Sequence, residues 1–171
     1  MSKGYIQVYT GDGKGKTTAS LGLALRAVCA GKKVYMGQFV KNMKYSEARA
    51  GEYLPGFMIE QYGIGCFFDR EPSKKDIEAA EKGLKTIKEI LRSGEYDLVI
   101  MDEINIALHY NLLSPTQVIE AVEERDPKVE VILTGRYAPE MIIEKADLVT
   151  EMKEVKHYYT DGVKARDGIE R

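Results

Sequence analysis

The sequence has few of the residues that build metal centres and disulfide frameworks. It contains only two histidines and two cysteines, and Cys29 and Cys66 lack a Cys-x-x-Cys spacing. The histidines offer no metal-ligand spacing with each other or with the cysteines, and neither accompanies a motif-defined nucleophile. We expect Cys29, inside an apolar helical pattern, to be a buried thiol, and His109 to lie on a helix surface or at an interface.

Long apolar runs and a strong net charge are also missing. No apolar segment approaches the roughly 18 residues of a membrane span, and the N-terminus has no charged-then-apolar signal pattern. The formal net charge is −2, so no overall basic field would recruit nucleic acid. The composition is globular, with 44% apolar and 30% charged residues. We expect a single soluble, cytoplasmic domain over residues 1–171, without nucleic-acid or membrane partners.

A glycine-rich stretch near the N-terminus carries the strongest functional signal. It follows an alternating segment, 4–9, that predicts a strand, and it leads into an apolar segment, 17–30, that predicts a buried helix closed by Gly31. In such a loop, backbone N–H groups and the helix dipole attract an anion. Lys16 supplies a charge for the terminal phosphates, and Thr17 supplies a ligand for Mg²⁺. The predicted nucleotide-binding residues are Thr10, Gly11, Asp12, Gly13, Lys14, Gly15, Lys16, Thr17 and Thr18.

The match to a P-loop is incomplete at its first position, where Thr10 replaces the usual glycine. Gly11 and Gly13 can compensate, because they give the backbone the freedom to curl. The alternative interpretation is a glycine-rich turn that carries two solvated lysines.

The rest of the chain alternates between strand and helix patterns. The strand predicted at 33–40 completes a βαβ unit, which indicates a parallel sheet. Residues 41–55 have no clear periodicity and predict a mobile loop over the C-terminal edge of the sheet. These patterns indicate an α/β fold of the P-loop NTPase (RecA-like) type, with a mostly parallel sheet flanked by helices on both faces. Further strands are predicted at 57–62, 97–103, 129–133 and 147–152, and helices at 73–94, 104–111, from 114 and at 139–145.

Two acidic residues close the continuous apolar run at 97–103. If this strand neighbours the strand before the phosphate loop, Asp102 and Glu103 lie near the metal side of a triphosphate. Either acid could ligate Mg²⁺, and Glu103 could instead act as a general base. Both could also merely favour the dipole of the following helix. Arg136 follows the strand at 129–133, where it could bind a phosphate or be an ordinary surface arginine.

Two consecutive phenylalanines, Phe67 and Phe68, follow Gly65 and Cys66. On a loop they cannot both face the core as a strand would present them. An apolar ring at the mouth of a polar site often contacts a large flat ligand, although core filling is the alternative.

These segments resemble the P-loop-type ATP:corrinoid adenosyltransferases of cobalamin synthesis and salvage over nearly the whole chain. The resemblance implies a homodimer that transfers the 5′-deoxyadenosyl group of ATP to a Co(I) corrinoid and releases triphosphate. It also implies an electron donor, such as a flavin-type reductase, that forms Co(I) from Co(II). The carrying segments are 10–18, 38–41 (Gln-Phe-Val-Lys), 101–104 (Met-Asp-Glu-Ile), 133–136 (Leu-Thr-Gly-Arg), 155–157 and 162–170.

The resemblance also implies roles for individual residues. Lys16 and Arg136 would be catalytic, because they would stabilise charge on the departing triphosphate. Glu103 would be a metal ligand rather than a base, beside Thr17 and Asp102. Phe68, or failing that Phe67, would lie against the corrin. Asp12 stands where relatives often have asparagine, and we expect it to contact the ribose. We expect the basic tail, 156–171, to lie over the active-site edge.

Two other functions fit the residues, which by themselves indicate a P-loop nucleotide-binding α/β domain. The first is a phosphotransferase or ATPase, which would need Glu103 or another acid as a base and would release ADP or phosphate. The second is an ATP-binding switch module without chemistry, which would bind ATP tightly and not turn it over.

Overall fold

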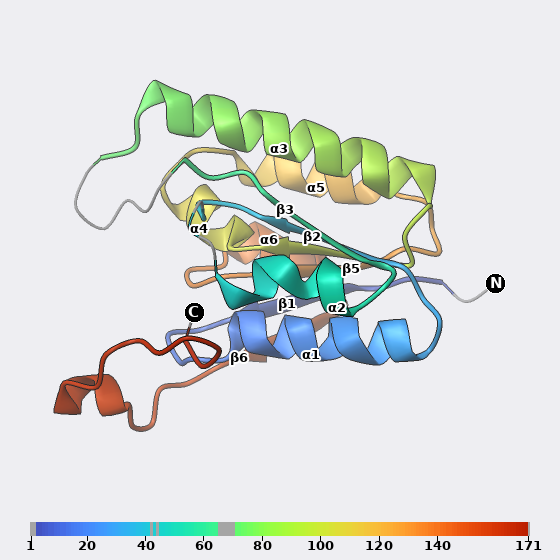
Figure 1. Ribbon diagram of the computed structural model, residues 1–171. Helices are drawn as coiled ribbons and strands as arrows, with labels where there is room; N and C mark the ends of the chain where they lie inside the picture. The colour runs from blue at the N-terminus through green and yellow to red at the C-terminus, as the bar shows by residue number, and fades with distance from the viewer. Residues whose placement is uncertain (1–2, 42, 44, 65–70, 171) are drawn as a thin grey trace.

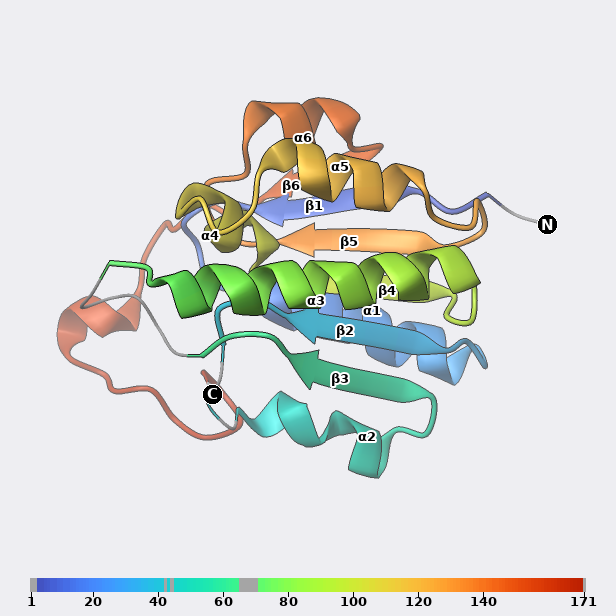
Figure 2. The ribbon, with the colours of Figure 1, turned by 90° about the horizontal axis from the view of Figure 1, so that it is seen from above.

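A computed structural model describes residues 3–41, 43, 45–64 and 71–170. At its centre is a six-stranded sheet in the order β3-β2-β4-β5-β1-β6, and every strand pairing in it is parallel (Figures 1 and 2). The carboxyl ends of the strands therefore meet at one edge of the sheet. The predicted α/β fold is confirmed. The strands are β1 (Ile6–Thr10), β2 (Val34–Gln38), β3 (Phe57–Gln61), β4 (Leu98–Asp102), β5 (Glu130–Thr134) and β6 (Leu148–Glu151).

Helices cover both faces of the sheet, as Figure 2 shows. Helices α3, α4, α5 and α6 pack on one face, and α1 and α2 pack on the other. The α-helices are α1 (Lys16–Cys29), α2 (Ala50–Tyr53), α3 (Lys74–Ser93), α4 (Ile104–His109), α5 (Pro115–Glu123) and α6 (Glu140–Lys145). Two 3₁₀ helices are η1 (Ser46–Arg49) and η2 (Tyr158–Asp161). Within the described ranges, no helix is long and apolar enough to cross a bilayer.

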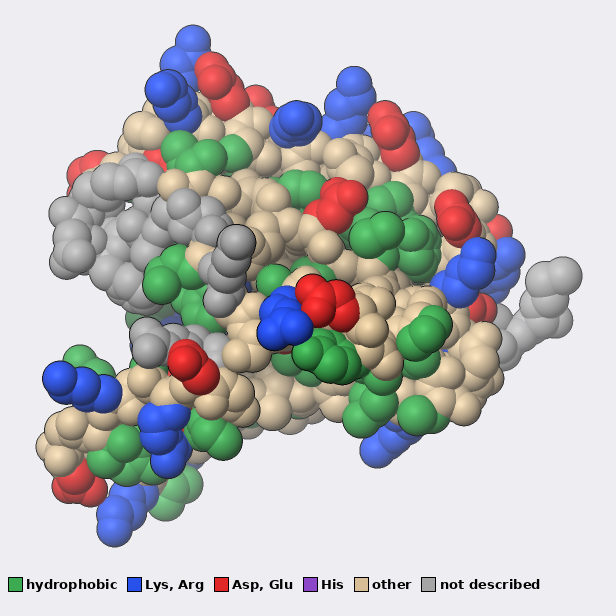
Figure 3. All heavy atoms as spheres, viewed as in Figure 1, with side chains coloured by type: hydrophobic (Ala, Val, Ile, Leu, Met, Phe, Trp, Pro, Cys, Tyr) green, Lys and Arg blue, Asp and Glu red, His purple; other side chains and the backbone are tan. Residues whose placement is uncertain are grey.

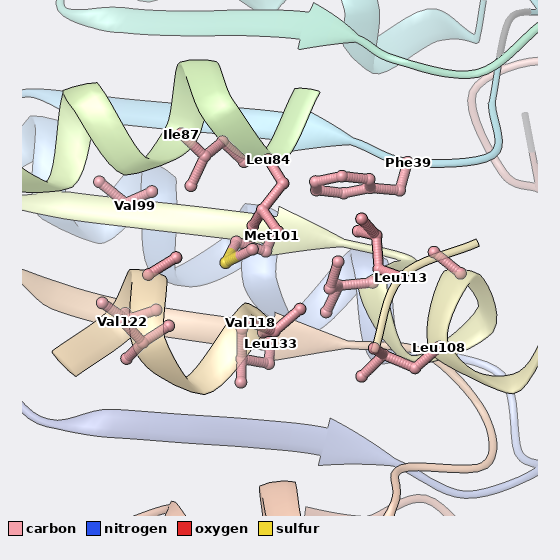
Figure 4. Packing of buried hydrophobic residues seen from close by; sticks show 14 of the residues in the cluster. Phe39, Leu84, Ile87, Val99, Met101, Leu108, Leu113, Val118, Val122 and Leu133 are labelled. Atoms are coloured by element: carbon pink, nitrogen blue, oxygen red, sulfur yellow. The ribbon is translucent and has the colours of Figure 1, made fainter. Parts of the chain in front are cut away.

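Strand β4 shows how the sheet separates two apolar cores. Its side chains alternate, so that Val99 and Met101 face the α3–α5 side while Leu98 and Ile100 face α1. All five residues of β4 are buried, which is typical of a continuous apolar strand in a parallel sheet. Figure 4 shows the larger core, in which α3, α4 and α5 pack onto β4 and β5.

Helix α3 begins and ends where the sequence predicts. Asp76 Oδ2 accepts hydrogen bonds from Ser73 N at 2.7 Å and Ser73 Oγ at 2.6 Å, which closes a capping box. Gly94 ends the helix at φ +61°, and a Cβ atom there would lie 2.6 Å from Asp126 Oδ2. Charged side chains of both signs cover the outer face of this helix (Figure 3). This outer face of α3 is therefore solvated.

Three features of the fold differ from the predictions. Strand β5 lies between β1 and β4, so the strand with the acids does not neighbour the strand before the phosphate loop. Besides Lys16, helix α1 buries only small residues, while Leu25 is 47% exposed and Cys29 is exposed rather than buried. The segment predicted as a loop at 41–55 contains η1 and α2, because Ala50 and Leu54 pack against the core beneath α1.

Candidate nucleotide-binding site

Four strand ends bring polar side chains together at the C-terminal edge of the sheet. Thr10, Gln38, Asp102 and Thr134 are the last residues of β1, β2, β4 and β5, and all four are buried. The glycine-rich loop follows Thr10, and α1 begins at Lys16. The insertion of β5 moves Asp102 away from β1 but leaves it at the same edge. The acid still reaches the first turn of α1, where Thr17 Oγ1 donates to Asp102 Oδ1 at 2.9 Å.

Lys16 lies inside the curl of the loop. Its Nζ donates to the carbonyl oxygens of Gly11 and Gly13, each at 2.7 Å, and the residue is 8% exposed. Burial lowers the pKa of Lys16, as does the charge of Arg136, while Glu103 and Asp12 oppose the shift. The ammonium group therefore lies where a bound phosphate would receive its charge.

The loop glycines are explained by the segment that follows β6. A Cβ atom on Gly11, whose φ is +94°, would lie 2.4 Å from the Met152 carbonyl oxygen. On Gly13 it would lie 2.8 Å from the same oxygen. Gly13 N donates to Met152 O at 2.7 Å, so this N–H points at the protein rather than into the cradle. Gly15 has φ +123° and precedes α1, with the Met152 sulfur nearby. Met152 therefore braces the loop.

Asp102 is the centre of the polar cluster. Its Oδ1 accepts from Thr17 Oγ1 at 2.9 Å and Thr134 Oγ1 at 2.7 Å. Its Oδ2 accepts from Lys41 Nζ at 2.8 Å and Gln38 Nε2 at 3.2 Å. A carboxylate has about four lone-pair positions, so these donors satisfy it fully. Asp102 is 0% exposed, and only such complete pairing makes a buried charge tolerable.

Lys41 provides the charge that balances Asp102. Burial acts to lower the pKa of Lys41, but the charge and hydrogen bond of Asp102, together with the charges of Glu103 and Glu47, outweigh it, and the pKa is raised. Lys41 Nζ also lies 3.7 Å from Glu47 Oε1, in η1. Gln38 extends the cluster, because its Nε2 donates to Glu47 at 3.2 Å and its Oε1 accepts from Gln61 at 3.0 Å.

Glu103 and Arg136 complete the edge of the site. Glu103 precedes α4 at φ 58°, and its backbone N donates to Thr134 Oγ1 at 3.0 Å. Burial raises the pKa of its carboxyl, as does the charge of Asp102, against Lys41, Lys16 and Arg136. The carboxylate of Glu103 forms no helix-capping hydrogen bond. Arg136 is exposed just beyond β5, on the same edge as Lys16.

The other predicted nucleotide-binding residues divide by their surroundings. Thr10 is buried, and its Oγ1 accepts from Ala138 N at 3.3 Å, so it ties β1 to the segment after Arg136. Asp12 and Thr18 are exposed. Lys14 faces the C-terminal tail, with Nζ 3.1 Å from Ile169 O and 3.8 Å from Glu170 Oε1. Phe67 and Phe68 lie outside the described residues.

Several residues of this cluster have no role that their sequence pattern predicts. Gln38 and Lys41 belong to the Gln-Phe-Val-Lys segment, and Thr134 to the Leu-Thr-Gly-Arg segment, but only their resemblance to a family marked them. Glu47 carries no local signal, because it lies in a stretch without periodicity. Met152 acts through its backbone, which no residue pattern reveals.

The oxygen atoms at Thr17 fit a magnesium ion. Mg²⁺ prefers hydroxyl, carboxylate and phosphate oxygens, and it takes only one or two carboxylates from the protein. The Thr17 hydroxyl lies 2.9 Å from an Asp102 oxygen, and Glu103 directly follows Asp102 in the chain. Among the residues that the structure describes, no group of three or more His, Cys, Asp or Glu could hold a metal by itself. Substrate phosphates and water would have to supply the remaining ligands.

Comparisons with known proteins show which family the chain resembles. The model of a family described as ATP:corrinoid adenosyltransferase BtuR/CobO/CobP matches residues 2–171. A corrinoid adenosyltransferase of Sinorhizobium sp is 39% identical over 98% of this chain and 80% of the relative. Proteins of the same name from Escherichia coli K12 and Pseudomonas aeruginosa are 37% and 34% identical, over 98% of this chain and 86% and 84% of their own lengths. The chain belongs to the ATP:corrinoid adenosyltransferase family.

Proposed function

We propose that this chain transfers the 5′-deoxyadenosyl group of ATP to a reduced corrinoid and releases triphosphate. The observation that carries the proposal is the cluster of Lys16, Thr17 and Asp102 at the carboxyl edge of the sheet, in a chain of this family. A phosphate cradle and a metal-side acid are the parts that a bound triphosphate needs.

The reaction asks the cradle to hold a leaving group. Co(I) of the corrinoid attacks C5′ of ATP with an electron pair, the C5′–O bond breaks, and that bond's electron pair leaves with the triphosphate. The cobalt becomes formally Co(III), and no proton has to move. Lys16 and Arg136 stabilise the charge that develops on the triphosphate. We assign Asp12, exposed beside the cradle, to the ribose hydroxyls.

Magnesium belongs to the same proposal. Thr17 and Glu103, with Asp102, would hold the ion, which supplies positive charge to the phosphate oxygens when it is bound. With cobalt as the nucleophile, no general base is needed, and this removes the reason to make Glu103 a base.

The corrinoid side of the site is proposed from the resemblance. Phe68, or failing that Phe67, lies against the corrin, and a flavin-type reductase or another donor delivers the electron that forms Co(I). We further propose a cytoplasmic homodimer, in which the tail 156–171 covers the active-site edge. The contacts of Lys14 with Ile169 and Glu170 support this position of the tail.

One anaerobic experiment separates this function from its rivals. The protein is mixed with Mg²⁺-ATP and chemically reduced cobalamin, the corrin spectrum is followed, and the phosphate product is identified. A Co–C spectrum together with triphosphate supports adenosyl transfer. ADP or phosphate as the product indicates a phosphotransferase or ATPase, and tight ATP binding without turnover indicates a switch module. Either of these results contradicts the proposal.

A further inference from the structure

The ammonium group of Lys41 lies among oxygen atoms on the metal side of the phosphate loop. Its Nζ is 2.8 Å from Asp102 Oδ2, 3.5 Å from Thr17 Oγ1 and 3.7 Å from Glu47 Oε1. Two of these three contacts are with side chains that we propose as ligands of a divalent cation. One lysine therefore already places positive charge beside the oxygens that Mg²⁺ would use.

The backbone around Lys41 is held in an unusual conformation. Val40 has φ 67°, which is rare for a β-branched residue and persists only where the surroundings impose it. Phe39 N donates to Asp102 O at 2.8 Å on one side. On the other side Gly63 N donates to Lys41 O at 3.1 Å, and a Cβ atom on Gly63 would lie 2.3 Å from the carbonyl carbon of Val40. Such strain is typical of functional positions, and here it aims Lys41 at Asp102.

Asp102 cannot accept a metal ion without losing a donor, because its four lone-pair positions are used. Of its four donors, Thr17 is itself a proposed ligand of the ion, and Thr134 and Gln38 are each 0% exposed and fixed by further hydrogen bonds. Lys41 is the charged donor, its side chain is 13% exposed, and its flexible stem lets it withdraw. The ring of Tyr45 lies 5.2 Å from Nζ and offers the ammonium group a second contact.

We infer that Lys41 is a resident counter-cation that occupies the divalent-cation position at Asp102 and Thr17 and that a divalent cation must displace. The inference rests on the proposed function in that it takes Thr17 and Asp102 as the metal side of the site. The ammonium group of Lys41 and a divalent cation cannot both lie against the Asp102 and Thr17 oxygens without strong repulsion. In the nucleotide-free protein Lys41 neutralises a buried carboxylate and keeps the affinity for free divalent cations low. Once displaced, its ammonium group remains beside the triphosphate.

The test measures Mn²⁺ binding to the nucleotide-free protein by electron paramagnetic resonance, without ATP or corrinoid. Lys41→Gln removes the charge and keeps a hydrogen-bond donor for Asp102, and Lys41→Arg keeps the charge. We expect Lys41→Gln to bind Mn²⁺ at least about tenfold more tightly than the wild type, and Lys41→Arg to match the wild type. Lys82→Gln, on the exposed face of α3, is the control for general loss of charge. Mn²⁺ binding by Lys41→Gln that is equal to or weaker than that of the wild type would overturn the inference. Absence of Mn²⁺ binding in both Lys41→Gln and the wild type would also overturn it.

A second variant and a second measurement guard against a folding defect. Lys41→Met leaves Asp102 buried beside an uncharged side chain, so its Tm without metal should fall. Millimolar Mn²⁺ should restore the Tm of Lys41→Met and leave that of Lys41→Arg almost unchanged. Failure of Mn²⁺ to restore it also contradicts the inference. A chain that passes these tests and makes no adenosylcobalamin would refute the proposed function alone.

Discussion

Gly11→Ala tests whether the phosphate loop depends on the chain segment that braces it. Alanine at φ +94° costs about 1–2 kcal/mol in backbone strain. Its Cβ atom would also lie 2.4 Å from Met152 O and 2.8 Å from Met152 N, so the brace must shift. The shift endangers the Gly13 N to Met152 O hydrogen bond, worth about 0.5–1.5 kcal/mol. We expect the free energy of unfolding to fall by about 2–4 kcal/mol.

Two other glycines supply matched controls. Gly31 has φ +77° and nothing within 4 Å of its Cβ position, so Gly31→Ala isolates backbone strain and should cost about 1 kcal/mol. Gly22 lies inside α1, with nothing within 4 Å and no positive φ, so Gly22→Ala should stabilise the protein by about 0.5–1 kcal/mol. The chain has eleven tyrosines and no tryptophan, so urea unfolding is best followed by far-ultraviolet circular dichroism or tyrosine fluorescence.

The three variants together test why the loop has glycine at position 11. If Gly11 serves phosphate binding alone, Gly11→Ala should lose ATP affinity, and its free energy of unfolding should match that of Gly31→Ala. A difference of less than about 0.5 kcal/mol between these two variants would refute the role of Met152 as a brace.

Three further changes test other parts of the structure. Lys16→Met should lower the rate of adenosyl transfer, measured by the corrin spectrum, at least about 100-fold. The control Lys82→Met should keep the wild-type rate. Wild-type activity in Lys16→Met would rule out the role of Lys16 in the cradle. Val40→Gly removes a buried side chain but relieves the strained backbone at φ 67°, so the free energy of unfolding should stay within about 1 kcal/mol of the wild type. The control Val99→Gly, in β4, relieves no strain and should lower the free energy of unfolding by about 3 kcal/mol or more. Equal losses in the two variants would show that Val40 is unstrained. Hydrogen bonds from Arg166 and Tyr158 lower the pKa of Glu170 to about 2, from an ordinary 4.5. The stabilisation that Glu170 gives the folded tail is therefore complete above pH 4.5 and is lost as the pH falls toward 2. Nuclear magnetic resonance of the Tyr158 ring should follow this change, and loss of the Tyr158–Glu170 contact already at pH 4.5 would contradict the prediction.

Elements with a local signal were predictable from the sequence. Ser73 and Gly94 mark the beginning and the end of α3 in the sequence. The continuous apolar run of β4 indicates a strand that is covered on both faces. The phosphate loop was visible because its glycines, Lys16 and Thr17 are adjacent in the chain. In each case the residues that define the element lie within a few positions of one another.

Features that depend on distant parts of the chain were not predictable. Lys41 and Asp102 are 61 positions apart, and no residue pattern pairs them. The order of strands is set by long-range packing, so the insertion of β5 between β1 and β4 left no local trace. Cys29 is exposed because it is the last residue of α1 and lies off the face that buries Ser20, Ala24 and Ala27, and an apolar pattern does not show which face of a helix is buried.

The most direct test of adenosyl transfer follows the reacting carbon itself. ATP labelled with ¹³C at C5′ is incubated anaerobically with Mg²⁺, reduced cobalamin and the protein, and the products are read by ¹³C and ³¹P nuclear magnetic resonance. We expect the label to move from a carbon bonded to phosphate oxygen to a carbon bonded to cobalt, with inorganic triphosphate formed in equal amount. A label that stays on ADP or on unreacted ATP would contradict adenosyl transfer by this chain.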